Sequence, residues 1–494
     1  MTVIKVEKIN EVYLHVWCDD SGIEAELVDY FTYEYPGAKF TPKFRARLWD
    51  GRVRLMDPIR KTLYCGLYQY LVKFAEANGY EIEHVNDIET HTNVEYEQIE
   101  EYANSLNLHG RGQPIEIRDY QLDAVYTGIH NRRTVLLSPT GSGKSLIIYT
   151  MARWHLEDNR KVLVVVPTTS LVEQMYSDFE DYSSHNGWST EEHCQKLYSG
   201  FPKHFQSDIL FTTWQSIYML PKAWFDQFDV VIGDEAHQFK AKSLTSIMEK
   251  MTEVKYRIGT TGSLDDKKIN RLVLEGIFGA VYRVTTTKKL QDEGKLAGLM
   301  ITALLLKFDD DTRKAHSKLE YKDEIDFIIT SEKRNKFLRN LAINCKGNTL
   351  LLFNYVERHG AVLYEMIRAK AGDRNVYFIH GGVDVTERER IRKVLATETD
   401  AIVVASYGTL STGINIPSIE NIIFGSPSKS VVRVLQSIGR GLRLNTGKLH
   451  CNLFDLTDDL HWKGRQNHTL KHGVDRYKIY SSEEFNIKLV EVNL

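Results

Sequence analysis

The stretch SPTGSGKS, from Ser138 to Ser145, lies between an apolar run at residues 135–137 and an apolar segment at residues 146–155. These flanks predict a buried strand before the stretch and a helix after it. Glycines at such a junction let backbone N–H groups turn toward phosphate oxygens, and the helix dipole favours a bound anion. We therefore expect a phosphate-binding loop, in which Lys144 reaches the outer phosphates of ATP and the Ser145 hydroxyl binds Mg²⁺.

The loop is a shortened form of the general phosphate-binding pattern, which has a glycine where this chain has Ser138. Taken alone, it leaves kinases, transporters and motor ATPases open as functions. The residues of this loop that we expect to contact the nucleotide are Thr140, Gly141, Ser142, Gly143, Lys144 and Ser145.

The composition is that of a globular protein with several domains. The chain has 494 residues and 42% apolar content, and its length predicts about three domains of the usual size. It contains no apolar run of about 20 residues, and residues 1–17 alternate like a strand, without the apolar core of a secretory signal. We expect a soluble cytoplasmic protein, whose five scattered cysteines are free thiols.

The formal net charge is −3, so the summed field of the molecule does not attract a polyanion. A nucleic-acid partner would have to be held by local basic patches and backbone N–H groups. Global charge therefore does not decide the partner.

A second motif, DVVIGDEAH, places two adjacent carboxylates directly after an apolar run at residues 230–232. Beside a phosphate loop, such a pair serves ATP hydrolysis. We expect Asp234 to hold Mg²⁺ through water, and Glu235 to orient or deprotonate the attacking water. Without the phosphate loop, the same pair would be an ordinary solvated strand end.

A third motif is QSIGRGLR at residues 436–443. In this order with the phosphate loop and DEAH, it resembles the superfamily 2 helicases and translocases. The resemblance implies two RecA-like domains, of which the first binds ATP and the second supplies Arg440 and Arg443 as arginine fingers. It also implies an ATP-hydrolysing enzyme, with the catalytic residues Lys144, Asp234, Glu235, Gln436, Arg440 and Arg443.

Shorter segments resemble the same family in the same order. RDYQLDAV carries Arg118 and Gln121, and the family's glutamine contacts the adenine edge and selects ATP. Gly413 is also expected at the nucleotide. Other segments resemble those that touch a nucleic-acid backbone, where hydroxyl groups and helix starts bind phosphates without reading sequence. They contribute Thr168, Thr212, Trp214 and Thr412.

Two segments depart from the family pattern. Asn415 stands where many relatives have an aspartate, so we assign it no catalytic role. The segment TTGS at residues 260–263 resembles the motif that couples hydrolysis to DNA movement, but Gly262 and Ser263 replace a more usual Ala-Thr pair.

The order of segments predicts an α/β protein. LHGRGQP at residues 108–114 has the composition of a linker, and strand-like and helix-like segments alternate after it. We expect parallel sheets with helices on both faces. A small N-terminal α/β DNA-binding domain would occupy residues 1–108, and two RecA-like domains would occupy residues 109–298 and 299–494. Strands of the last domain are expected near residues 350–353, 376–379, 401–405 and 421–424, followed by a C-terminal helix and strand.

The N-terminal region contains RARLWDGRVRLM, in which Asp50 and Gly51 form the strongest short hairpin signal. A two-residue turn there predicts a core face of Ala46, Leu48, Val53 and Leu55. The opposite face would carry Arg45, Arg47, Trp49, Arg52 and Arg54. Opposed like charges destabilise a sheet, which suggests that DNA occupies this face, and a solvated face explains the arginines equally well.

WDGR ahead of two motor domains, SEKRN at residues 331–335 and KHGVDR at residues 471–476 together resemble the UvsW-type recombination helicases of tailed phages. The resemblance implies ATP-driven, 3′ to 5′ unwinding and branch migration of forks, Holliday junctions and D-loops. These activities serve recombination, repair and replication restart in the host bacterial cytoplasm. The implied partner is branched DNA, or duplex DNA with single-stranded regions. RNA–DNA hybrids and recombination or single-strand-binding proteins are further candidates, and a membrane is not expected.

Three other functions stay open on the sequence. An RNA helicase or a hybrid-unwinding motor would share these motifs, because they contact phosphates rather than bases. A non-catalytic junction-binding protein could hold ATP as a structural ligand, although Glu235, Arg440 and Arg443 argue against it. A restriction-type motor subunit is weakened by the lack of a nuclease motif.

Overall fold

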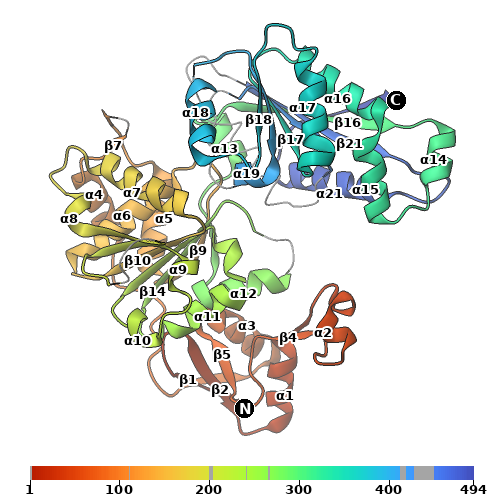
Figure 1. The fold of residues 1–494 in the computed structure, drawn as a ribbon. Helices are drawn as coiled ribbons and strands as arrows, with labels where there is room; N and C mark the ends of the chain where they lie inside the picture. The colour runs from red at the N-terminus through yellow and green to blue at the C-terminus, as the bar shows by residue number, and fades with distance from the viewer. Residues whose placement is uncertain are drawn as a thin grey trace. The chain divides into compact units, whose positions relative to one another are not determined.

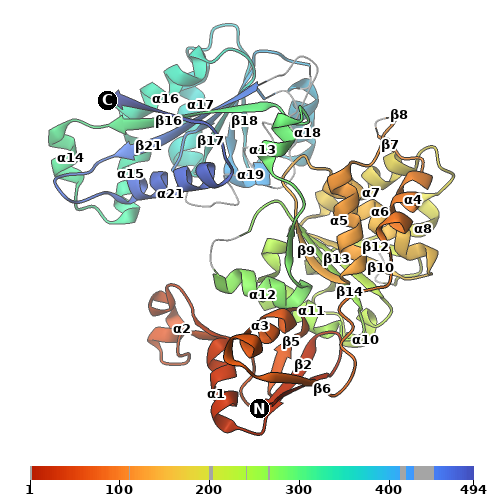
Figure 2. The same ribbon diagram turned by 180° about the vertical axis from the view of Figure 1, so that it is seen from behind.

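A computed structural model describes residues 3–110, 112–199, 204–240, 242–264, 268–395, 397–411, 419–427 and 450–494. Backbone proximity divides the chain into two compact units (Figures 1 and 2). The first comprises Met1–Ser138 and Gly143–Val284, and the second comprises Pro139–Ser142 and Thr285–Leu494.

A mixed four-stranded sheet begins the first unit, with strand order β5-β2-β1-β6. β1 lies antiparallel to β2 and parallel to β6. Because successive strand side chains point to opposite faces, Ile4 and Val6 are buried in one core with Leu27 and Leu71. The strands are β1 (Val3–Lys8), β2 (Tyr13–Cys18), β5 (Thr62–Tyr64) and β6 (Glu81–His84). The helices of this region are α1 (Ser21–Tyr30), α3 (Tyr68–Asn78) and α4 (Tyr96–Ser105).

The segment at residues 32–54, which we call the arm, projects from this sheet (Figures 1 and 2). It is built from β3 (Thr32–Glu34), α2 (Pro42–Arg45) and β4 (Arg52–Arg54). β4 pairs antiparallel with β3, with Tyr33 opposite Val53. The predicted hairpin around Asp50 and Gly51 is therefore wrong, and Arg47 does not face Arg54.

A helix replaces the first strand of the predicted hairpin. Thr41 caps α2 by accepting the Phe44 N–H, and Pro42 occupies its first turn, an arrangement that favours helix initiation. Ala46 and Leu48, expected in the core, are exposed. Val53 and Leu55 do pack into the core, as predicted.

The N-terminal region packs on α11 (Lys242–Lys250) and α12 (Lys268–Phe278), two helices of the first unit. A Cβ at Gly66 would lie 2.0 Å from the carbonyl oxygen of Glu275, so only glycine permits this approach. The Tyr64 hydroxyl donates to Glu249 Oε1 at 2.6 Å. A tight backbone contact and a partly buried hydrogen bond therefore join the N-terminal region to these two helices.

The first unit also holds seven parallel strands in the order β11-β12-β10-β13-β14-β9-β15, which confirms the predicted RecA-like sheet. The strands are β9 (Arg133–Leu137), β10 (Val162–Val166), β11 (Cys194–Leu197), β12 (Ile209–Thr213), β13 (Val230–Asp234), β14 (Tyr256–Thr261) and β15 (Val281–Arg283). The helices are α5 (Asp119–His130), α6 (Lys144–Glu157), α7 (Thr169–Ser183), α8 (Thr190–His193), α9 (Trp214–Ile217), α10 (Lys222–Phe225), α11 (Lys242–Lys250) and α12 (Lys268–Phe278). Before α5, part of the predicted linker forms the short pair β7 (His109–Gly110) and β8 (Gln113–Pro114).

The second unit contains another parallel sheet of seven strands, in the order β18-β19-β17-β20-β21-β16-β22. The strands are β16 (Gly298–Lys307), β17 (Thr349–Phe353), β18 (Val376–Ile379), β19 (Ile402–Ser406), β20 (Asn421–Phe424), β21 (His450–Asp459) and β22 (Ile487–Asn493). The helices are α13 (Thr287–Asp292), α14 (Asp310–His316), α15 (Tyr321–Thr330), α16 (Glu332–Asn344), α17 (Ala361–Arg368), α18 (Val385–Leu395), α19 (Tyr407–Ser411) and α21 (His468–Ser482). The C-terminal helix and strand form as predicted, because β22 pairs with β16.

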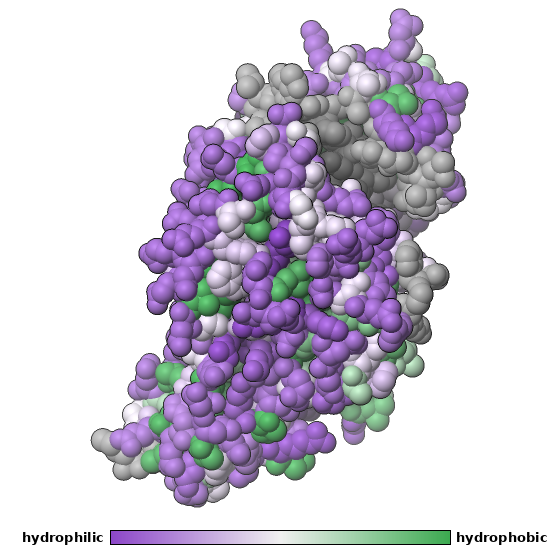
Figure 3. Space-filling view, turned by 90° about the vertical axis from the view of Figure 1, so that its left-hand side faces the viewer, coloured by the Kyte–Doolittle hydropathy of each residue, from purple (hydrophilic) through white to green (hydrophobic). Residues whose placement is uncertain are grey.

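The surface drawn in Figure 3 is mostly hydrophilic, and its hydrophobic residues lie in small separate groups. Within the ranges that the structure describes, we find no helix with the length and apolarity needed to cross a membrane.

Candidate ATP site and nucleic-acid interface

The phosphate loop connects β9 to α6, as the sequence predicts. Gly141 and Gly143 adopt left-handed φ angles of 87° and 85°, which glycine tolerates best. Lys144 begins α6, and its Nζ donates to the Ser138 carbonyl oxygen at 3.4 Å. The loop therefore presents its lysine at the positive end of a helix dipole, where an anion is favoured.

The adenine motif lies directly behind this loop. Gln121 is buried, and its Oε1 accepts the Arg118 N–H at 3.0 Å. A Cβ at Gly143 would lie 2.2 Å from Gln121 Nε2, so the loop has no room for another residue there. The Arg118 guanidinium donates to Tyr120 at 2.8 Å. The structure thus brings the two predicted nucleotide motifs into contact.

Three neighbouring strands, β13, β14 and β9, carry DEAH, TTGS and the phosphate loop to the same edge of the sheet. Asp234 ends β13 opposite Thr260, whose hydroxyl donates to Asp234 Oδ1 at 2.7 Å. The Ser138 N–H donates to the Thr261 carbonyl at 2.8 Å. The central strand β14 therefore links the carboxylates to the phosphate loop.

Asp234 is only 7% exposed. Burial raises the pKa of this carboxyl, and the adjacent Glu235 raises it further, while Lys144 and the Thr260 hydrogen bond act in the opposite direction. Two neighbouring carboxylates in a buried position are costly without a cation. Glu235 adopts a left-handed φ of 51°, an uncommon conformation for a side-chain-bearing residue.

The oxygen donors present fit Mg²⁺, which prefers carboxylates, hydroxyl groups and phosphates. Asp234 and Ser145 are the residues that would hold it, as the sequence predicts. Ser145 Oγ lies 2.8 Å from the Tyr182 hydroxyl, a contact that the sequence did not indicate. His237 was also not assigned a role, and its Nδ1 lies 3.0 Å from Thr261 Oγ1 and 3.2 Å from Glu235 Oε2.

The predicted strand-contacting residues of the first unit lie at the carboxyl ends of β10 and β12, which are neighbouring parallel strands. Thr168 caps α7 by accepting the Leu171 N–H, and partly buried Trp214 begins α9. Thr212 is fully buried, and its hydroxyl donates to the Leu197 carbonyl at 2.7 Å. A direct phosphate contact from the Thr212 side chain is therefore not supported, because this hydroxyl is already used inside the fold.

Sequence comparison gives a close relative of the whole chain. The ATP-dependent DNA helicase UvsW of Enterobacteria phage T4 is 35% identical, and the alignment covers 99% of this chain and 100% of that protein. The chain belongs to the UvsW family. The crystal structure of T4 UvsW matches with a TM-score of 0.52 and 32% identity, covering 99% of both chains.

Three family models match successive parts of the chain. The model "DNA helicase UvsW, N-terminal" matches residues 4–85. The models "Type III restriction enzyme, res subunit" and "Helicase conserved C-terminal domain" match residues 114–266 and 332–445. A putative restriction-enzyme HsdR fragment from Vibrio vulnificus, at 17% identity and a TM-score of 0.58 over 90% of this chain and 76% of that one, shares the fold.

The part of the chain that matches the UvsW N-terminal model includes the arm, which carries the predicted DNA-binding residues Arg45, Arg47, Trp49, Arg52 and Arg54. The four arginines are exposed. Trp49 Nε1 donates to the Arg52 carbonyl at 2.8 Å, and Asp50 forms an ion pair with Arg54. The structure therefore brings these residues together on one projecting element, although without the predicted strand pairing.

Five predicted site residues of this UvsW relative lie outside the described residues. They are Thr412, Gly413, Gln436, Arg440 and Arg443, and Asn415 lies there too.

Proposed function

We propose that this UvsW-family protein is an ATP-dependent DNA helicase that unwinds and branch-migrates forks, Holliday junctions and D-loops. The observation that carries the proposal is the meeting of DEAH, TTGS and the phosphate loop on three neighbouring strands. The 35% sequence identity to the ATP-dependent DNA helicase of phage T4, over 99% of this chain, supports DNA as the substrate. We further propose 3′ to 5′ polarity and a role in recombination and replication restart in the cytoplasm of a bacterial host.

In this proposal, Lys144 and the loop N–H groups bind the ATP phosphates, and Gln121 contacts the adenine. Mg²⁺, held by Ser145 and Asp234, would supply charge neutralisation at the phosphates. Glu235 orients the attacking water and accepts its proton. Arg440 and Arg443, from the second RecA-like domain, stabilise charge on the phosphoryl group as it transfers.

DNA contacts are proposed at Thr168, Trp214 and Thr412 on the motor domains and at the arm. Exposed arginines on a projecting element suit phosphate contacts, which supply affinity without reading sequence. RNA–DNA hybrids, recombination proteins and single-strand-binding proteins are further proposed partners. An RNA helicase is the main alternative, because the motor motifs contact phosphates in both nucleic acids.

Two substitutions test the ATPase in the full-length protein. Lys144→Ala should abolish ATP turnover, and Glu235→Gln should retain ATP binding but lose hydrolysis by about 100-fold or more. Glu191→Gln, at an exposed position on α8, is the matched control and should behave as the wild type. Normal turnover in Glu235→Gln would overturn the assignment of the base.

The substrate is tested by strand separation on matched DNA and RNA forks. ATP-dependent unwinding of forks and Holliday junctions made of DNA supports the proposal, and stronger stimulation by RNA would favour the alternative.

A triple variant tests the DNA contact of the arm. We expect Arg47→Ala/Arg52→Ala/Arg54→Ala to bind DNA more weakly than the control Lys314→Ala/Lys318→Ala/Lys370→Ala. The control removes three exposed lysines of the second unit, so both variants lose equal charge. Equal affinity and salt dependence in the two triple variants would rule out the arm contact.

A further inference from the structure

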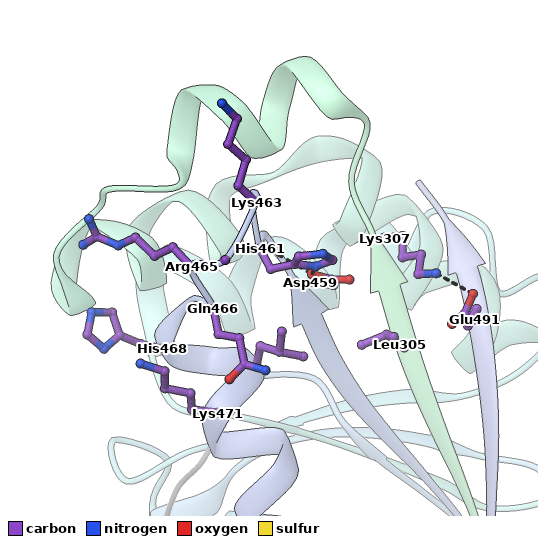
Figure 4. Close-up of a pocket in the computed structure, with 12 residues that line it drawn as sticks. Leu305, Lys307, Asp459, His461, Lys463, Arg465, Gln466, His468, Lys471 and Glu491 are labelled. Carbon is purple, nitrogen blue, oxygen red and sulfur yellow. Dashed lines mark hydrogen bonds and ion pairs between the residues drawn. The ribbon is translucent and has the colours of Figure 1, made fainter.

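The second unit contains a pocket of about 800 Å³ near the carboxyl ends of β16 and β21 (Figure 4). The loop at residues 460–467, which joins β21 to α21, forms much of its wall. Six basic side chains line it: Lys307, His461, Lys463, Arg465, His468 and Lys471. The pocket lies in a region that none of the predicted ATP or DNA motifs covers.

Positive charge exceeds negative charge in this pocket. Its lining has four lysine or arginine side chains against two carboxylates, Asp459 and Glu491. Both carboxylates are engaged: Glu491 pairs with Lys307 at 2.5 Å, and Asp459 lies 2.5 Å from His461 Nδ1. Lys463, Arg465 and Lys471 remain exposed, with no carboxylate in ion-pair range among the described residues. Figure 4 shows Arg465 and Lys471 on the same side of the pocket as His468.

The loop that presents these cations is held by a buried polar network. The guanidinium of Arg334 donates to Asp458 at 2.6 and 3.0 Å, and both side chains are fully buried. Glu324 accepts the Asn467 side-chain amide at 2.9 Å and the Thr469 hydroxyl at 2.7 Å. Buried polar networks with several such bonds restrict the conformation of the segments that they join. SEKRN, which contains Arg334, therefore supports the loop from inside the second unit.

The turn at the tip of the loop directs its cations outward. Trp462 and Arg465 exchange two backbone hydrogen bonds of 3.1 Å, which close a turn over Lys463 and Gly464. Lys463 adopts a left-handed φ of 52°, a conformation that a residue with a side chain keeps only when its surroundings enforce it. The backbone of this exposed lysine is therefore fixed at the rim of the pocket.

The chemistry of the pocket identifies its ligand class. Glu324 already accepts the N–H groups of His468 and Thr469 at the start of α21, so an anion must be bound by side chains. The residues that line the pocket include no tryptophan, tyrosine or phenylalanine on which a base could stack. Exposed lysine and arginine side chains bind phosphates without reading bases.

We infer that this pocket binds the sugar-phosphate backbone of a DNA strand, as a contact additional to the motor motifs and the arm. The inference rests on the proposed function, which supplies the polyanion. Lys463, Arg465 and Lys471 would each neutralise a phosphate, and every such contact adds about 0.9 to the salt dependence of binding.

The test compares Lys463→Ala/Arg465→Ala/Lys471→Ala with the control Lys314→Ala/Lys318→Ala/Lys370→Ala in the full-length protein. Affinity for a fluorescent forked DNA is measured over a range of salt concentrations. The pocket variant should bind about tenfold more weakly, with a salt slope shallower by about 2.7. ATPase activity without DNA and affinity for a fluorescent ATP analogue should equal those of the control.

Equal DNA affinity and salt slope in the two variants would overturn the inference. Weakened binding of the ATP analogue with unchanged DNA binding would also overturn it, because the pocket would then hold a free nucleotide. Failure of the wild-type protein to bind forked DNA would instead contradict the proposed function. The Gly464→Ala variant, whose added Cβ meets no described atom within 4 Å, checks that loop substitutions preserve folding.

Discussion

The hydroxyl of Tyr182 lies 2.8 Å from Ser145 Oγ, so the group expected to bind Mg²⁺ is already hydrogen-bonded within the protein. Tyr182 belongs to α7, and its ring packs beside Tyr149 of α6, with ring centroids 5.5 Å apart. Mg²⁺ that binds Ser145 Oγ would therefore compete with the Tyr182 hydroxyl for this oxygen, or it would bind while the hydroxyl donates to the same oxygen. A hydrogen bond of this kind contributes about 0.5–1.5 kcal/mol net.

Tyr182→Phe should lower the Mg²⁺ concentration that gives half-maximal ATPase activity by about two- to tenfold, because it removes the competing hydroxyl. A Mg²⁺ titration at saturating ATP and DNA measures this directly. Tyr176→Phe, on the same helix but packed against Lys196, is the control and should not shift the midpoint. An unchanged or higher midpoint in Tyr182→Phe would show that the tyrosine does not compete with the metal.

The contact between Ser145 and Tyr182 shows which part of the site could be predicted from the sequence. The phosphate loop and DEAH are local motifs, in which spacing along the chain fixes the geometry at a strand end. Tyr182 reaches the loop only through the packing of α7 on α6. No local pattern distinguishes it from Tyr176, the other tyrosine of the same helix.

The arm shows a different kind of failure. Asp50-Gly51 is a strong local hairpin signal, but Thr41 and Pro42 start a helix, and β4 finds its partner in β3. The paired strands lie almost twenty residues apart in the sequence, so tertiary contacts, and not the local sequence, determine this pairing. The parallel sheets were predictable because a continuous apolar run such as Val162–Val166 is typical of a parallel strand that is buried on both faces.

Thr260→Val should move the acidic limb of the pH profile of kcat/KM to higher pH. The Thr260 hydroxyl favours ionised Asp234, whose pKa burial raises, so removing the hydroxyl raises the pKa further. The limb should move by about one to two pH units, since a hydrogen bond to a charged group contributes about 1.5–3 kcal/mol and one pH unit corresponds to about 1.4 kcal/mol. Activity is then lost earlier as the pH falls.

Thr150→Val is the control for this substitution, because Thr150 is buried in α6 and donates to the Leu146 carbonyl away from the carboxylates. Its profile should overlay that of the wild type. If the acidic limbs of Thr260→Val and wild type coincide, the Thr260 hydroxyl does not influence the ionisation of Asp234.

Gly66→Ala should loosen the N-terminal region from α12 of the first unit. The new Cβ would lie 2.0 Å from the Glu275 carbonyl and 2.7 Å from that of Gly276, and backbone cannot move aside cheaply. Overpacking of this kind costs about 1–3 kcal/mol. Thermal unfolding should show a lower midpoint, and stimulation of the ATPase by forked DNA should fall while basal ATPase persists.

Gly381→Ala is matched to this change, because a Cβ at Gly381 meets no described atom within 4 Å. It should retain both the melting temperature and the stimulation by DNA. A Gly66→Ala protein as stable as Gly381→Ala would mean that the N-terminal region is not held to α12 at this contact.

The protein should lose stability below neutral pH through His155 and His359. Burial lowers the pKa of each to about 3, from an ordinary value of 6.5. The unfolded chain takes up these protons as the pH falls through 6.5, whereas the folded chain does not, so stability is full above 6.5 and declines toward 3. Each histidine contributes a slope of about 1.4 kcal/mol per pH unit in this window.

Urea unfolding at pH 7.5 and pH 5.5 measures this loss. His155→Leu should reduce the difference between the two free energies of unfolding by about 1 kcal/mol, whereas His450→Gln, at an exposed position, should leave the difference unchanged. An identical difference in His155→Leu and wild type would mean that His155 is protonated normally in the fold.

Phe40 and Leu48 of the arm are 78% and 80% exposed, although both are large apolar side chains. They contribute little to folding at this exposure, so Phe40→Ser/Leu48→Ser should change stability by less than about 0.5 kcal/mol. Basic arms that carry apolar side chains can place them against unstacked bases at a junction, where each contact is worth about 1–3 kcal/mol. The double variant should therefore bind forked DNA at least about fivefold more weakly, with unchanged affinity for blunt duplex.

Ile59→Ser, at an 89% exposed position just outside the arm, controls for the loss of an exposed apolar side chain. Equal weakening on fork and duplex would show that these side chains do not contact the unpaired bases, and that the arm binds DNA through its charges alone.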